Sequence, residues 1–191
     1  AALALTGPRG AGKWDLALQL AAALPASDAI QVDGTIDGAR QVKQFVHMMP
    51  LDGDRRLAIV DGRRGISDAA QDAYLKVCEE TPATAALVLV LEDANALHPA
   101  LSSRLHVISW GPFSDAEMRS LVAASGLPED EFAISASRGR IKMYPVVLQH
   151  AEALRGLYGA AVDLASGKAD LMRAPAILSE WSKLDDECKD A

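Results

Sequence analysis

Two kinds of segment alternate along the chain up to residue 110: short strand-like runs and longer stretches with helix-like patterns. The strand-like runs lie at residues 2–6, 29–33, 57–60, 87–91 and 105–109. The helix-like stretches lie at about 13–24, 35–48, 67–80 and 99–101, and Thr35 and Ser67 can cap the second and third of them. The run at 87–91 is apolar throughout, which is typical of a central parallel strand buried on both faces. This alternation predicts an α/β fold, in which helices cover both faces of a parallel sheet.

The pattern changes at Gly111 and Pro112, after which only helix-like segments follow. Ser114 and Glu117 have the spacing of a capping box, which marks the start of a helix. We expect helices at about 114–124, 129–135, 140–164 and 173–185. Pro145 should kink the third of these or end a turn within it. The expected organisation is an α/β domain over 1–111, a helical lid domain over 112–170, and a further helical segment or linker beginning over 171–191.

A glycine-rich motif, Gly-Pro-Arg-Gly-Ala-Gly-Lys-Trp, occupies residues 7–14 between the first predicted strand and the first helix. The pattern G-x-x-x-x-G-K followed by Ser or Thr binds phosphate: backbone amides cradle the oxygens, the lysine reaches the outer phosphates, and the hydroxyl holds magnesium. An indole stands here at the hydroxyl position. The candidate nucleotide-binding residues are Gly7, Gly10, Gly12, Lys13 and Trp14. The alternative is a glycine-rich turn with an incidental lysine.

The third predicted strand ends at Asp61, the place of the acid that orients magnesium in such sites. Active members of the class mostly carry a second acid at the next position, where it polarises the attacking water. This chain has Gly62 there. Asp61 alone could equally be a plain acid at a strand end. With the hydroxyl and the second acid both missing, the pattern indicates that hydrolysis has been lost.

Two arginines are further candidates. Arg104 ends the short helix that precedes the fifth strand, and it is badly placed for its own phosphate loop but well placed to reach a neighbouring subunit. An arginine supplied in this way stabilises charge on a transferring phosphate. Arg140 begins a predicted lid helix and could turn toward a nucleotide. The competing interpretations, an ordinary surface arginine and a solvent-facing helix start, are comparable on these residues alone.

Composition narrows the class of protein. Half of the 191 residues are hydrophobic and few are aromatic, so Ala, Leu and Val must build the core. A net charge of −7 and a pI near 5.0 argue against a chain that coats nucleic acid on its own. Cys78 and Cys188 form no C-x-x-C pair, which indicates a reducing compartment and no zinc site. Without an apolar run near ~18 residues or a signal peptide pattern, we expect a cytoplasmic protein with no membrane partner.

Three stretches resemble one family. Residues 49–61 read MPLDGDRRLAIVD, residues 66–82 read ISDAAQDAYLKVCEETP, and residues 97–104 read LHPALSSR. Together they resemble the AAA+ clamp-loader subunits of bacterial DNA polymerase III, and most of all the delta-prime type, which is related to gamma/tau. The resemblance spans about 1–145, and the segments around Lys76 and Ser103-Arg104 are its most specific parts.

The resemblance implies a RecA-like AAA+ domain, a helical lid and a collar domain that lies beyond residue 191 or only begins here. Delta-prime subunits commonly lack a working ATP site, so Trp14 and Gly62 fit this type, with ATP or ADP bound weakly at most. They still offer a Ser-Arg finger to an adjacent ATPase subunit, which favours that role for Arg104. The implied partners are gamma/tau and delta-type subunits, the sliding clamp, and primer–template DNA reached through the complex.

The chain also departs from the family. The related subunits usually carry a four-cysteine zinc module between the loop and the second strand, and this chain has no cysteine between Lys13 and Asp61. Asp72 and Tyr74 stand where the family has Asn and Leu. The alternatives are an active gamma/tau-type ATPase and an AAA+ scaffold outside replication. Because the chain starts almost on a strand and without Met, we expect it to belong to a longer gene product.

Overall fold

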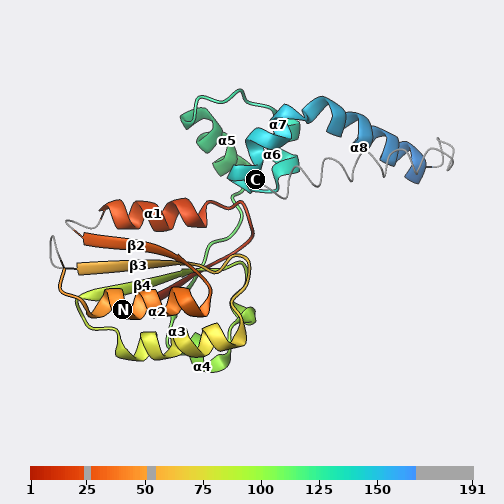
Figure 1. Cartoon of the computed structure of the whole chain (residues 1–191). Helices are drawn as coiled ribbons and strands as arrows, with labels where there is room; N and C mark the ends of the chain where they lie inside the picture. Colours follow the sequence, from red (N-terminus) through yellow and green to blue (C-terminus); the bar gives the residue numbers. More distant parts are fainter. Residues whose placement is uncertain (24–26, 51–54, 167–191) are drawn as a thin grey trace. The chain divides into compact units, whose positions relative to one another are not determined.

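A computed structural model describes residues 1–23, 27–50 and 55–166 (Figure 1). The chain divides into two compact units, of which the first ends at Gly111 and the second begins at Pro112. Within the described residues no helix is long and apolar enough to cross a membrane. The expected helix at 173–185 and the segment 171–191 lie outside the described residues.

The first unit is built on a five-stranded parallel sheet with the order β2-β3-β4-β1-β5. The strands are β1 (Ala2–Thr6), β2 (Ser27–Asp33), β3 (Arg55–Asp61), β4 (Ala85–Val90) and β5 (His106–Ser109). Since all strands run the same way, their first residues form one edge of the sheet, the amino edge, and their last residues form the carboxyl edge. The predicted α/β fold is confirmed, and the apolar β4 does lie inside the sheet, between β3 and β1.

Helices cover both faces of this sheet (Figure 1). They are α1 (Lys13–Ala23) on one face, α2 (Ile36–His47) and α3 (Asp68–Glu80) on the other, and the short η1 (Ala94–Ala96) and α4 (Pro99–Ser102) before β5. Alternate strand residues feed two cores: Leu5 and Ile59 pack with α1, whereas Ala58 and Leu87 pack with α2 and α3. The predicted N-caps are confirmed, because the hydroxyls of Thr35 and Ser67 accept hydrogen bonds from backbone amides of their own helices.

Tyr74, one of the departures from the family pattern, links α3 to the sheet. Its side chain is fully buried, and its hydroxyl donates a hydrogen bond of 2.8 Å to the carbonyl of Asp33, the last residue of β2. Burial raises the pKa of this phenol, so it stays a neutral donor. The tyrosine therefore fixes the carboxyl end of β2 beside the candidate site, which a leucine could not do.

The second unit is helical in its described part. Its elements are α5 (Asp115–Ala124), α6 (Glu131–Ser137), η2 (Ile141–Met143), α7 (Tyr144–Gln149) and α8 (Ala151–Ala165). The capping box of Ser114 and Glu117 is confirmed, with both of its hydrogen bonds formed. The single helix predicted at 140–164 is wrong. Pro145 lies in the first turn of α7, where a missing amide costs nothing, and the backbone leaves helical geometry at His150 before α8 begins.

Candidate functional site

The glycine-rich segment 7–12 connects β1 to α1 at the carboxyl edge, as predicted for a phosphate loop. Two neighbouring strands hold it in place: the Gly7 amide donates to Glu92 O at 3.1 Å, and the Trp110 indole Nε1 donates to Ala11 O at 2.8 Å. Gly7 is required by close packing, because a Cβ there would lie 1.9 Å from Trp110 O. The loop is therefore a shaped element fixed by the residues that follow β4 and β5.

The side chain of Lys13 folds back onto the glycine-rich loop that precedes it. Its side chain is buried, and Nζ donates to Gly7 O at 2.6 Å and to Pro8 O at 2.7 Å. Burial lowers its pKa, an effect that nearby Glu92 opposes and nearby Arg63 adds to. A phosphate at this loop must replace two charge-assisted hydrogen bonds and sit near the carboxylate of Glu92.

Trp14, Arg63 and Asp61 form a stack at the position where the motif places magnesium. The Arg63 guanidinium lies 4.8 Å from the centre of the Trp14 ring. The same guanidinium binds both oxygens of Asp61, with Nε–Oδ1 at 2.8 Å and Nη2–Oδ2 at 2.7 Å. The Arg63 amide adds a third hydrogen bond to Asp61 Oδ1 at 3.2 Å. These hydrogen bonds hold the pKa of Asp61 below its usual range.

Gly62, at the position of the missing second acid, is closely packed. Gly62 is buried, and its amide donates to Val90 O at 2.9 Å. A Cβ at this residue would lie 2.5 Å from Leu91 Cδ2 and 3.0 Å from Ile66 Cδ1. Any side chain at 62 therefore requires the ends of the Leu91 and Ile66 side chains to shift, so the glycine fits this packing and brings no water-activating acid.

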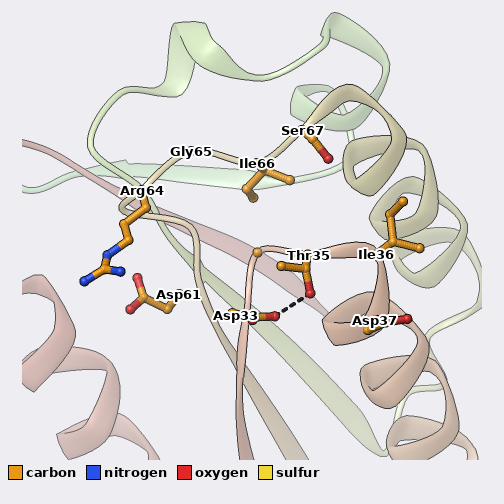
Figure 2. Close-up of a pocket in the computed structure, with 10 residues that line it drawn as sticks. Asp33, Thr35, Ile36, Asp37, Asp61, Arg64, Gly65, Ile66 and Ser67 are labelled. Atoms are coloured by element: carbon orange, nitrogen blue, oxygen red, sulfur yellow. Dashed lines mark hydrogen bonds between the residues drawn. The ribbon is translucent and has the colours of Figure 1, made fainter.

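An open pocket of about 880 Å³ adjoins this stack at the carboxyl ends of β2 and β3 (Figure 2). Three carboxylates line it, those of Asp33, Asp37 and Asp61, against the one guanidinium of Arg64. Thr35, also in the lining, donates to Asp33 Oδ1 at 2.5 Å. The pocket wall is therefore predominantly acidic, which disfavours a polyphosphate. Among the described residues, no three His, Cys, Asp or Glu side chains gather as a metal site requires.

Arg104 lies at the other edge of the sheet. It comes between α4 and β5, and His106, the first residue of β5, pairs with Leu3 near the start of β1. From Leu3 to Gly7, β1 rises by four residues, roughly 13 Å at about 3.3 Å each. The Arg104 side chain is 42% exposed and forms an ion pair of 2.7 Å with Glu79. It therefore lies at the surface of the unit, at the edge of the sheet opposite its own loop.

Arg140 belongs to the second unit, where it precedes η2 and its Nε donates to Ser137 O at 3.3 Å. It starts a short 3₁₀ turn, not the long helix that the sequence suggested. Its contact with a nucleotide stays a prediction. The structure thus brings Gly7, Gly10, Gly12, Lys13, Trp14 and Asp61 together at the carboxyl edge. It places Arg104 apart from them.

Three residues that contact the candidate site residues were not predicted from the sequence: Arg63, Glu92 and Glu79. Arg63 had a weak local signal, because an Asp-Gly-Arg turn lets an aspartate accept from the amide two residues on. Glu92 and Glu79 had none, since each meets its partner only through the folding of distant segments.

Comparison with known proteins supports the α/β fold described above. Residues 27–114 match the family described as DNA polymerase III, delta subunit. A DNA polymerase III gamma-subunit-related protein from Thermotoga maritima is similar in structure, with 24% identity, a TM-score of 0.62, and coverage of 84% of this chain and 57% of that one. The Thermotoga maritima RuvB Holliday junction branch migration motor is 17% identical with a TM-score of 0.55, covering 94% and 60%. Curated proteins gave no match.

At these identities the two structures establish the fold alone, which is that of a RecA-like AAA+ domain. This chain spans less than two thirds of the length of either relative. The family match begins after the glycine loop and includes Asp61, Glu79 and Arg104. Over residues 27–114, less than half of its length, the chain is therefore similar to the clamp-loader subunits of DNA polymerase III.

Proposed function

We propose that this clamp-loader-type subunit of DNA polymerase III is a non-hydrolysing, delta-prime-like member of its complex. In this role it helps to load the sliding clamp onto primed DNA and supplies Arg104 to the nucleotide on a neighbouring ATPase subunit. The observation that carries the proposal is the stack of Trp14, Arg63 and Asp61.

The residues of this stack do not fit magnesium. In P-loop hydrolases a loop hydroxyl and a strand-end acid hold the ion. Here the hydroxyl position is an indole, and both oxygens of the acid are bound by Arg63. A divalent cation at Asp61 has to break a bidentate charge-assisted pair and meet the positive charge of the displaced guanidinium. Hydrolysis also lacks its second acid, because residue 62 is a glycine that packs closely against Leu91 and Ile66.

The position of Arg104 supports the finger role. An arginine at the amino edge, partly exposed and remote from the loop of its own sheet, can contribute to a phosphate site only across a subunit boundary. Gamma/tau-type and delta-type subunits are the proposed neighbours. The acidic charge of the chain is compatible with this role, because contact with primer–template DNA can be shared among the subunits.

The test is ATP turnover by the isolated full-length subunit. With ATP and magnesium, we expect phosphate release no faster than that of an Asp61→Asn variant, because neither protein can hold the ion. Calorimetry should show at most weak ATP binding that does not depend on magnesium. Micromolar binding with turnover that disappears in Asp61→Asn would contradict the proposal and favour an active gamma/tau-type ATPase.

A further inference from the structure

The guanidinium of Arg104 is held in one orientation by contacts from two helices. Glu79, near the end of α3, accepts from Nη2 at 2.7 Å. Within and just after α4, Ala100 O accepts from Nη1 at 2.9 Å, and Ser103 Oγ lies 3.3 Å from the same nitrogen. Ser103 in turn donates to Ala100 O at 2.9 Å. The arginine is exposed, yet its side chain is not free to rotate without breaking these contacts.

We propose that Glu79 is the positioning residue of the arginine finger, an inference that rests on the proposed function. Arginine has a flexible side chain whose rotamer entropy must be lost before it can bind a phosphate in one geometry. The contacts to Ala100 and Ser103 both engage Nη1 and come from α4 and the residue that follows it. Glu79 engages the other terminal nitrogen from a separate, longer helix. It therefore fixes the plane of the guanidinium, which the local contacts alone do not.

The neighbouring acid provides a matched comparison. Glu80 is exposed to the same extent as Glu79, but it pairs with Lys43 of α2 at 2.7 Å. The two adjacent carboxylates thus serve different partners, one on α2 and one at the finger. A change of Glu80 removes the same charge from the same helix end without touching Arg104, so it separates positioning from general electrostatics.

The experiment is ATP hydrolysis by the reconstituted full complex carrying Glu79→Gln. We expect kcat per assembled complex to fall about two- to fivefold, the range that a half-exposed ion pair contributes. KM for ATP should not change, because the finger acts on the transition state more than on bound ATP. Glu80→Gln should leave kcat unchanged. In an Arg104→Ala background, Glu79→Gln should have no further effect, because its target is gone.

Three results overturn the role of Glu79 alone: an equal fall in the Glu79→Gln and Glu80→Gln complexes, a rise in kcat on Glu79→Gln, or an additive loss in the Arg104→Ala background. A rise would mean that Glu79 withholds the arginine instead of positioning it. If Arg104→Ala itself leaves hydrolysis unchanged, the finger role fails and the inference fails with it.

Discussion

Replacing Arg104 by alanine should lower DNA-stimulated ATP hydrolysis by the assembled clamp-loader complex about 10³-fold or more. An arginine that neutralises charge on the transferring phosphate is worth roughly 10³ to 10⁵ in rate when it comes from a neighbouring subunit. Assembly should be retained, because the Arg104 side chain is 42% exposed and its ion pair with Glu79 lies at the surface, where such pairs add little to stability. Phosphate release per assembled complex, with assembly measured by gel filtration, provides the readout.

The control for this variant is Arg119→Ala. Arg119 is also an exposed arginine in an ion pair, with Glu131 at 2.8 Å, but it belongs to the second unit. We expect its replacement to leave hydrolysis within about twofold of the parent complex, as for a surface pair of small energy. Hydrolysis that is unchanged in Arg104→Ala, with the complex intact, removes the finger role.

Replacing Arg56 by methionine should lower the free energy of unfolding by about 3 kcal/mol. Arg56 is 4% exposed and joins β3 to β2 and α2: it pairs with Asp28 at 3.1 Å and donates to Phe45 O at 3.0 Å and to Met49 O. Its guanidinium also lies 4.6 Å from the centre of the Phe45 ring. Methionine fills much of the volume but removes the cation beside the half-buried Asp28 carboxylate and the donor to the carbonyls of Phe45 and Met49. Chemical denaturation measures the loss.

Two further variants test whether the lost interactions of Arg56 cause this fall in stability. Arg55→Met changes an exposed neighbour and should alter stability by no more than about 0.5 kcal/mol. Adding Asp28→Asn to Arg56→Met should recover part of the loss, because it removes the carboxylate that has lost the Arg56 cation. A loss in Arg56→Met as small as that in Arg55→Met would show that the buried pair is not important for folding.

Much of the first unit could be predicted from the sequence, because its signals are local. The apolar run at 87–91 identified the central strand, and Thr35 and Ser67 marked helix starts through hydrogen bonds that span only three residues. The error at 140–164 has an equally local cause. A proline that could kink a helix can as well begin one, and the residues around Pro145 do not distinguish these outcomes.

The candidate site was predictable only in part. The indole at Trp14 and the glycine at Gly62 were visible as departures from a motif, since a motif assigns a role to each position. The residue that now contacts Trp14 and Asp61 could not be identified from the motif. That Arg63 stacks on Trp14 and binds Asp61 depends on how the ends of β1 and β3 are brought together. The tether of Arg104 to Glu79 likewise links residues that only the packing of α3 against α4 makes neighbours.

The proposed function has two parts: this chain contributes an arginine to hydrolysis on a neighbouring subunit, and it hydrolyses no ATP itself. The most direct measurement is the ATP turnover of the reconstituted complex in which this subunit carries Lys13→Met, compared with the Arg104→Ala complex. We expect turnover per assembled complex within about twofold of the parent for Lys13→Met, beside the large loss for Arg104→Ala. A comparable loss in both complexes would contradict the proposed function, because the loop of this subunit would then be an active site.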